Sequence, residues 1–156
     1  HRILVSSPKV ATYDLMPEMS APEVKDKIIA YMKSDTPDFI CLNFANPDMV
    51  GHTGVFSAIV KAVETVDNCL EEIVNEGKRI GYEFIVIADH GNADLAINPD
   101  ETPNTAHTTN PVPIILISDD QNLKVKNGKL ADIAPSILKR IGVSPPSEMD
   151  GESLIY

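Results

Sequence analysis

The sequence alternates between stretches in which apolar residues recur every three or four positions and short stretches that are apolar almost throughout. The first kind is typical of helices with one buried face, and the second of strands covered on both faces of a sheet. Because the two kinds alternate, we expect an α/β domain with a largely parallel sheet. The predicted helices cover residues 20–33, 55–75 and 130–141, and the predicted strands cover residues 38–45, 83–88 and 112–117.

Residues with strong local preferences mark the ends of these elements. The phrase "SAPE", residues 20–23, fits a capping box with a proline in the first helical turn. Gly77 is the expected stop of the long central helix. Near the end of the chain, "LKVKNGKL" predicts a short hairpin or edge segment that turns at Asn127 and Gly128.

Composition narrows the classes of function. A chain of 156 residues with 43% apolar content is long enough for one domain with a real core. Its formal charge of −10 argues against binding to a nucleic-acid backbone. No apolar run approaches the length of a membrane span, and no signal peptide is visible. We interpret Cys41 and Cys69 as buried free thiols of a protein in a reducing compartment, the cytoplasm.

Candidate chemistry lies in three short phrases, "NPDMVGHTG", "VIADHGNAD" and "TAHTTNPVP". Asp48 and His52 follow the first predicted strand, and Asp89 and His90 follow the second. His107 stands in the loop that enters the third. In open α/β sheets, ligands bind beyond the carboxyl ends of the strands, so we expect these side chains to meet at one edge.

The spacing of these residues has a chemical meaning. Asp48 and His52 are four positions apart, so one helical turn would aim both at one ion. Asp89 and His90 are adjacent, so they share an ion only at an irregular strand end, or else serve neighbouring ions. Oxygen and imidazole ligands without thiolate favour Mn, Zn or Fe. Five such ligands with His107 suggest a two-ion centre that clamps phosphoryl oxygens.

Each of these side chains also has an ordinary structural explanation when it is taken singly. Asp48 after Asn-Pro fits a turn cap, His90 fits a hydrogen-bonded histidine at the rim of a core, and His107 fits a plain loop residue. These readings weaken because three of the four histidines fall beside predicted strand ends. His1 is the exception and is given no role.

The residue types around the candidate ligands are as informative as the spacing of the ligands themselves. The three phrases, together with "SPKVATYDLMPEMSA" at residues 7–21, resemble the cofactor-independent phosphoglycerate mutase family, a branch of the alkaline phosphatase superfamily. The resemblance covers nearly the whole chain. It implies an alkaline-phosphatase-like three-layer α/β/α sandwich. It also implies an isomerase of glycolysis that interconverts 3-phosphoglycerate and 2-phosphoglycerate with two manganese ions and a phosphoserine intermediate.

The resemblance assigns roles to the candidate residues. By matching motif positions, Asp48, His52 and His107 would hold one ion, and Asp89 and His90 would contribute to the other. Zinc or another divalent ion is an alternative to manganese at both. These carboxylate and imidazole groups come from distant parts of the chain. The assigned roles therefore require that the folded chain brings them together.

Lys9 in "SPKVATYD" matches a lysine that the family places at the substrate phosphate, where a point charge suits an anion. Sequence alone would favour a solvated lysine at this position.

One part of the family pattern has no counterpart here. In the family, an N-terminal part carries the nucleophilic serine and a further metal-binding aspartate, and a transferase domain is inserted before the part that this chain resembles. No serine of this chain stands in that nucleophile motif. We therefore expect residues 1–156 to be the C-terminal portion of the phosphatase domain, with one ion site intact, the second half built, and no mutase turnover alone. The family member would be a monomer, whereas an uncovered sheet edge would invite self-association of the portion.

Two alternatives stay open at this point. Another phosphohydrolase of the superfamily, or a phosphopentomutase, would keep the metal ligands but would not be expected to keep "SPKVATYDLMPEMSA". A non-catalytic metal-binding module is the alternative from another class.

Overall fold

The computed structural model describes residues 1–156, which fold as two compact units. The first unit comprises His1–Tyr82 and His90–Pro111. The second comprises Glu83–Asp89 and Val112–Tyr156. Each unit has its own helices and its own buried residues.

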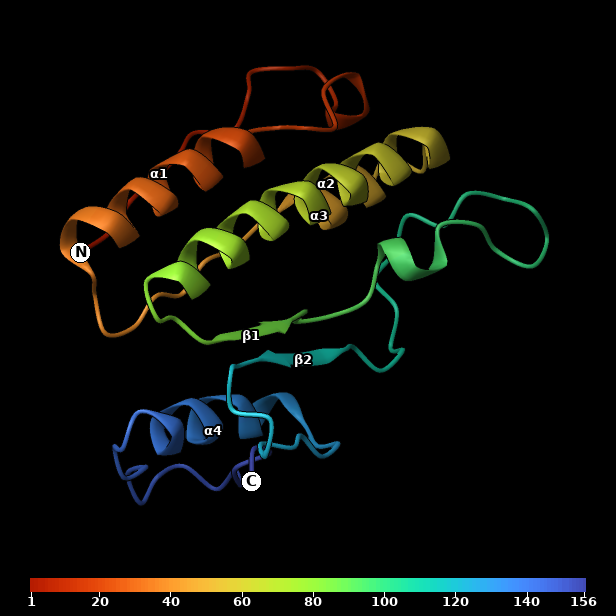
Figure 1. Ribbon diagram of the computed structural model, residues 1–156. Coiled ribbons are helices and arrows are strands. Elements are labelled where there is room, and N and C mark those ends of the chain that lie inside the picture. The colour runs from red at the N-terminus through yellow and green to blue at the C-terminus, as the bar shows by residue number, and fades with distance from the viewer. The chain divides into compact units, whose positions relative to one another are not determined.

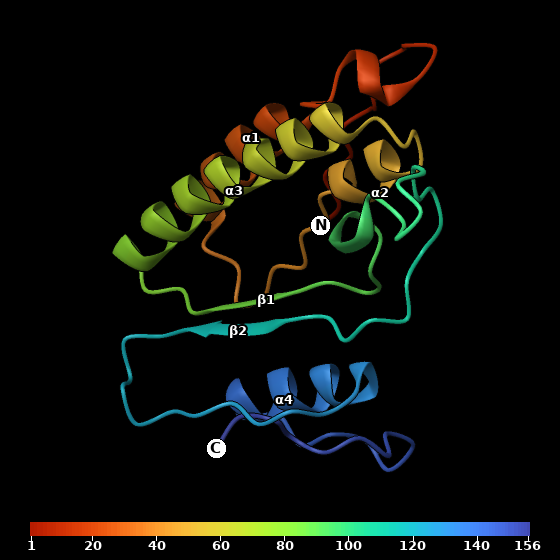
Figure 2. The same cartoon turned by 90° about the vertical axis from the view of Figure 1, so that its right-hand side faces the viewer.

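The first unit is helical. Helices α1 and α3 lie side by side and are parallel, so that both point the same way from their N-terminal to their C-terminal ends (Figures 1 and 2). The short helix α2 packs against α3. The bounds are Ala21–Asp35 for α1, Asn46–Gly51 for α2 and Phe56–Arg79 for α3, with short 3-10 helices at Tyr13–Leu15 and Ala93–Leu95.

The helix predicted over residues 55–75 is confirmed, but its predicted end at Gly77 is wrong. Gly77 is buried within α3, which continues to Arg79. The stop is Gly81, whose φ of 93° lies in the left-handed region that a glycine adopts without strain. The amide of Tyr82 donates to the carbonyl of Gly77, as in a Schellman motif.

The helix predicted over residues 20–33 is confirmed as α1, which begins one residue later and ends two residues later, but its capping box is not formed. Ser20 occupies the N-cap position without a side-chain capping bond. Its hydroxyl instead donates to the carbonyl of Ser6 at 2.7 Å and so ties the N-terminal segment to the start of the helix.

The core of the first unit lies where α2 and α3 meet. Val50 is completely buried there, although Asp48 and His52, two positions before and after it, are polar. The burial of this one apolar side chain holds α2 against α3 by the hydrophobic effect. The buried cluster consists of Met19, Val50, Ala58, Ile59, Ala62 and Ala96.

The strand predicted over residues 38–45 is wrong. The segment is extended but forms no strand, since its backbone finds no neighbour with which to exchange ladder hydrogen bonds. Its residues alternate between exposed and half-buried positions from Ile40 to Ala45. An apolar run shows that a segment suits a sheet, but it cannot show that a partner strand is present.

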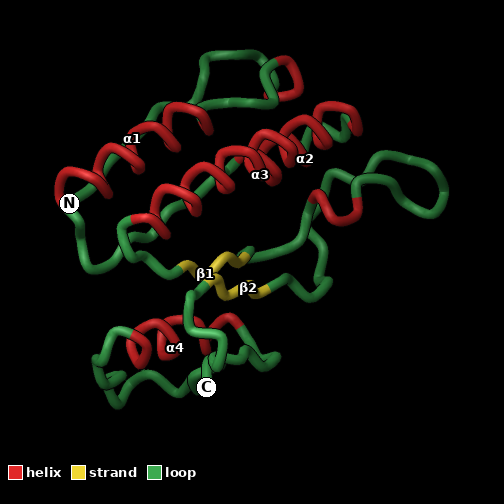
Figure 3. The backbone as a smooth tube through the Cα atoms, viewed as in Figure 1, coloured by secondary structure: helices red, strands yellow, loops and turns green.

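The second unit contains the only sheet, a pair of strands β1 (Phe84–Ile87) and β2 (Ile114–Ile117) (Figure 3). Both strands were predicted, with slightly wider bounds. The expectation of a largely parallel sheet is wrong, because β1 and β2 are antiparallel and pair Phe84 with Ile117 and Ile87 with Ile114. A parallel pair requires a crossover, usually a helix, and the segment between these strands contains only a 3-10 turn.

The helix predicted over residues 130–141 is confirmed as a 3-10 turn, Leu130–Asp132, that leads into α4, Ile133–Arg140. The predicted hairpin at Asn127 and Gly128 is not formed. The edge-segment alternative is correct, because Lys124 exchanges backbone hydrogen bonds with Tyr156 at the end of the chain.

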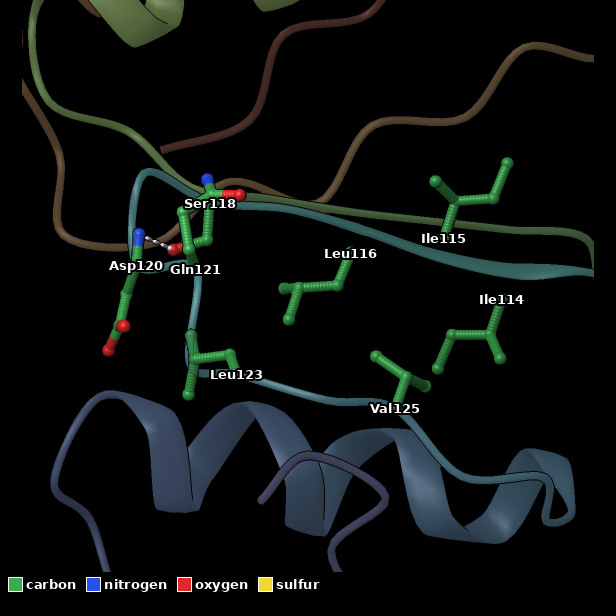
Figure 4. Close-up of a pocket in the computed structure, with 8 residues that line it drawn as sticks. All are labelled: Ile114, Ile115, Leu116, Ser118, Asp120, Gln121, Leu123 and Val125. Carbon is green, nitrogen blue, oxygen red and sulfur yellow. Dashed lines mark hydrogen bonds between the residues drawn. The ribbon is translucent and has the colours of Figure 1, made fainter.

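A hollow of about 360 Å³ lies beside β2 (Figure 4). Ile114 and Leu116 point from the strand toward the space that Leu123 and Val125 also line, while Ile115 points away (Figure 4). The lining is mainly aliphatic and carries no cluster of ionisable groups. It therefore offers no chemistry comparable with that of the histidine cluster described below.

The structure also shows the state of the two cysteines and the character of the helices. Both cysteines are free thiols, as predicted, but only Cys69 is buried, whereas Cys41 is exposed in the extended segment. No helix is long and apolar enough to cross a membrane.

Candidate metal centre

The short helix α2 places two candidate ligands on one side. Asp48 lies in its first turn and His52 at its C-cap, four positions later, so both project from the same edge. Val50 and Gly51 between them are buried. This alternation anchors the helix with its apolar residue and leaves the two polar side chains about one-third to one-half exposed.

His107 arrives from a loop 55 residues further along the chain and completes a cluster of three ligand atoms. Its Nε2 lies 2.9 Å from Oδ1 of Asp48 and 3.1 Å from Nε2 of His52. Nε2 of His52 lies 3.2 Å from the same Asp48 oxygen. The structure thus brings together the three residues that were predicted to share one ion.

The backbone favours one tautomer of one ligand. Nδ1 of His52 lies 2.7 Å from the carbonyl oxygen of Thr105, which can only accept a hydrogen bond. In the neutral imidazole this contact favours the proton on Nδ1, a tautomer in which the lone pair of Nε2 is directed at the cluster. A histidine that binds a metal through one nitrogen usually donates from the other in this way.

The triangle of donor atoms fits a divalent ion. Ligand atoms about 2.1 Å from a common ion lie about 3.0 Å apart in octahedral and about 3.4 Å apart in tetrahedral coordination. The observed separations of 2.9, 3.1 and 3.2 Å fall in or near this range. Two imidazoles and one carboxylate suit Mn, Fe or Zn and do not suit a thiolate-type structural zinc site.

Asn92 lies buried beneath this cluster. Its amide nitrogen donates to Oδ1 of Asp48 at 3.1 Å, the same oxygen that faces both histidines. Its own Oδ1 is buried without a hydrogen-bond partner. A buried acceptor left unpaired costs about 1–3 kcal/mol, so this atom lowers the stability that the side chain contributes.

A second set of contacts holds the His107 loop in place. The Asp94 carboxylate accepts hydrogen bonds from Thr108 Oγ1 and from Asn110 Nδ2, the latter at 2.6 Å. The Asn110 amide is the main reason why the pKa of the Asp94 carboxyl lies below its ordinary value. Thr108 also donates its amide to the carbonyl of Gly91. Because a side chain at position 91 would meet Thr108 and Asp94, only glycine allows this close approach.

His90, which was predicted to contribute to the other ion, contacts one of the three ligands in this structure. Its ring is stacked on that of His107, with centroids 3.8 Å apart and planes 19° apart. It adds no atom to the three-ligand cluster. In this structure His90 therefore supports the face of His107.

The other two predicted residues are not among the three ligands of this cluster. Asp89 is exposed and belongs to the second unit, two residues beyond β1. Lys9 is exposed and forms no ion pair. Their predicted roles, in the second ion site and at the phosphate, remain predictions.

Sequence reasoning missed the residues that arrange the ligands. The Thr105 carbonyl leaves no trace in the sequence, because any residue type supplies a carbonyl. Asn92 closely follows the predicted strand end, but nothing in the sequence shows that it faces Asp48. The polar triad of Asp94, Thr108 and Asn110 did have a signal, since short polar side chains cluster on both sides of the two histidines.

Comparisons with known proteins agree with this chemistry. The model of the Metalloenzyme superfamily matches residues 1–145. The 2,3-bisphosphoglycerate-independent phosphoglycerate mutases of Parabacteroides distasonis and Bacteroides thetaiotaomicron are 58% and 56% identical to the chain over 99% of its length. The chain spans only 30% and 31% of the length of these two relatives.

A solved structure shares the fold. The phosphoglycerate mutase of Leishmania mexicana, crystallised at low cobalt concentration, superposes with a TM-score of 0.87 at 28% identity. The match covers 97% of this chain and 31% of that enzyme. With the family model matched over almost the whole sequence and a three-ligand cluster in place, the chain belongs to the metalloenzyme superfamily.

Proposed function

We propose that the chain is the C-terminal, metal-binding part of a 2,3-bisphosphoglycerate-independent phosphoglycerate mutase, which interconverts 3-phosphoglycerate and 2-phosphoglycerate in glycolysis. The observation that carries the proposal is identity of 56–58% with proteins of that name over 99% of the chain. The cluster of Asp48, His52 and His107 supports it, because such an enzyme needs divalent ions at the transferring phosphoryl group.

The remaining two thirds of such an enzyme would supply what this chain lacks. The relatives are about three times as long as the matched region. We propose that their other part carries the nucleophilic serine, a further metal-binding aspartate and an inserted transferase domain. It would also supply the strands that complete a three-layer sandwich, since the segment 38–45 pairs with no strand here.

Two divalent ions, manganese in our proposal, would be bound. The Asp48, His52 and His107 cluster would hold the first, and Asp89 and His90 would contribute to the second with groups from the rest of the enzyme. When bound, such ions lower the pKa of a serine hydroxyl and neutralise charge on phosphoryl oxygens.

The chain's own residues would prepare the site for an anionic substrate. The Thr105 carbonyl favours the proton of His52 on Nδ1, and the stacked ring of His90 supports His107. Lys9 is exposed and would meet the phosphate as a point charge. Since the formal charge is −10, bound cations and such local basic groups are needed before a phosphoglycerate can approach.

The proposal also includes the cellular location and the oligomeric state of the protein. We propose a cytoplasmic enzyme that acts as a monomer at its natural length. Neither nucleic acid nor a membrane would be a partner, consistent with the acidic composition and with the glycolytic role.

A titration of the chain with Mn²⁺ tests the metal site. We expect one ion per chain by calorimetry, and a loss of affinity of at least about tenfold for His107→Ala, because one of three ligands is removed. His1→Ala is the matched control, since His1 stacks on Tyr31 and touches no ligand. Equal Mn²⁺ affinity in both variants would remove the ligand assignment.

An activity assay tests the reaction. The protein at its natural length, coupled to enolase, should convert 3-phosphoglycerate, lose turnover with a chelator and regain it with Mn²⁺. The 156-residue chain alone should show none. Robust turnover by the chain alone would mean that the nucleophile lies within it and that the proposed division of the site is wrong.

A further inference from the structure

The side chain of Asn92 stands between two residues of α2 without being a predicted ligand. It is 5% exposed, its amide nitrogen reaches the Asp48 carboxylate, and its oxygen faces Gly51. We propose that Asn92 is a positioning residue of the metal centre, which holds the Asp48 carboxylate in its ligating orientation and requires glycine at position 51. The proposal rests on the proposed metal site.

The Asp48 carboxylate needs an external constraint. It projects from a helix of six residues, and its side chain is one-third exposed, so its carboxylate can rotate. The Asn92 amide donates to Oδ1, the same oxygen that lies 2.9 Å from His107. This hydrogen bond directs Oδ1 toward the two imidazoles before any ion is bound. Hydrogen-bonded groups behind metal ligands act in this way in other proteins.

The orientation of the Asn92 amide supports a role at Asp48 over a role in stability. If the amide were reversed, its oxygen would face the carboxylate oxygen at 3.1 Å, and two acceptors would repel each other. The observed orientation avoids this but leaves Oδ1 buried and unpaired. A purely structural asparagine would satisfy both of its polar atoms, whereas this one satisfies the atom that faces the ligand.

The position of the Asn92 side chain depends sterically on glycine at position 51. A Cβ atom at position 51 would overlap Oδ1 of Asn92 and lie 2.7 Å from its Cγ. The Asn92 side chain therefore reaches Asp48 only because α2 carries no side chain at position 51. An alanine there would push Asn92 away, and Asp48 would lose its donor.

The test uses Co²⁺ as the probe, because its visible absorption reports the ligand set directly. Asn92→Leu keeps the branched shape of the side chain and removes the donor. We expect Co²⁺ affinity to fall about 10- to 100-fold, with a changed spectrum. Asn68→Leu is the matched control, because Asn68 is exposed on α3 and bonds only within that helix. Circular dichroism checks that each variant folds, and Asn92→Ala, which adds no bulk, takes the place of the leucine variant if that one does not.

A double-mutant cycle tests the link to Gly51. Gly51→Ala should weaken Co²⁺ binding in the presence of Asn92 but have little further effect in the Asn92→Ala background. Equal losses in both backgrounds would overturn the shared-space argument. A folded Asn92→Leu variant with unchanged affinity and spectrum, beside a His107→Ala variant that has lost binding, would overturn the positioning role and leave the metal site standing. A wild-type chain without Co²⁺ binding would overturn both.

Discussion

The position of the ligands depends on how one short helix is packed, and truncation of Val50 tests this directly. Helix α2 has only six residues and no side-chain cap, so it is too short to be stable by itself. Val50 is completely buried in the core of the first unit and stands midway between Asp48 and His52. We therefore expect Val50→Ala to destabilise the unit that carries the metal centre.

The magnitude follows from complete burial. The substitution removes two methyl groups, and about 0.8 kcal/mol for each gives roughly 1.6 kcal/mol of lost transfer free energy. The cavity of roughly 50 Å³ adds about 1.2 kcal/mol at about 24 cal/mol per Å³ if the core does not relax. The free energy of unfolding should therefore fall by about 2–3 kcal/mol, toward the lower end if α2 shifts to fill the space.

Urea denaturation followed by circular dichroism measures this change, because the long helices α1 and α3 of the same unit dominate the helical signal. Val60→Ala is the matched control. It makes the same chemical change on the 40% exposed side of α3 and should cost less than about 0.5 kcal/mol. If the two variants lose equal stability at equal m-value, Val50 does not anchor α2 and the argument fails.

Two further predictions concern polar contacts. Asn46→Asp should destabilise the first unit more than Asn46→Ala in the same denaturation experiment, by about 1–3 kcal/mol or more. The buried amide donates to the carbonyls of Pro17 and Glu18, and a carboxylate would turn both bonds into repulsion. Glu83→Gln should cost at most about 1 kcal/mol at pH 7, because its pair with Arg140 is partly exposed. The Arg140 guanidinium lowers the pKa of the Glu83 carboxyl, so this stability is present above the unfolded-state pKa of about 4.3 and is lost as pH falls through the folded-state value. Thermal melts between pH 7 and 3 should show that the melting temperatures of the wild type and Glu83→Gln converge only below about pH 4. A difference in melting temperature that does not change with pH would refute the ion pair.

Local patterns in the sequence were sufficient to predict α1, α3, α4 and the two paired strands, whereas the short helix α2 was not among the predicted elements. Helical spacing of apolar residues located α3, and a continuous apolar run located β1, because both signals depend on burial that each segment experiences itself. Helix ends were less certain. Gly77 and Gly81 both offer a stop, and which of them adopts the left-handed conformation depends on packing that sequence does not reveal.

Sheet pairing could not be predicted, because it is a property of two segments at once. The segment 38–45 has the composition of a buried strand and yet no partner, and β2 runs antiparallel to β1 where alternation with helices favoured a parallel pair. Asp48 and His52 therefore follow a segment without strand pairing, and not the end of a paired strand as predicted. These residues still meet His107, since their spacing on one helical turn holds wherever α2 lies.

The cluster of Asp48, His52 and His107 is complete within the first unit, and this makes its geometry a property of that unit alone. Every contact that arranges the three ligands comes from the same unit, including the Thr105 carbonyl and the Asn92 amide. A site whose ligands and supporting hydrogen bonds belong to one packed unit keeps its geometry without help from the rest of a longer enzyme. Since all three ligands and their hydrogen-bond partners lie in the first unit, the packing of that unit, and of Val50 in particular, decides the geometry of the proposed first ion site.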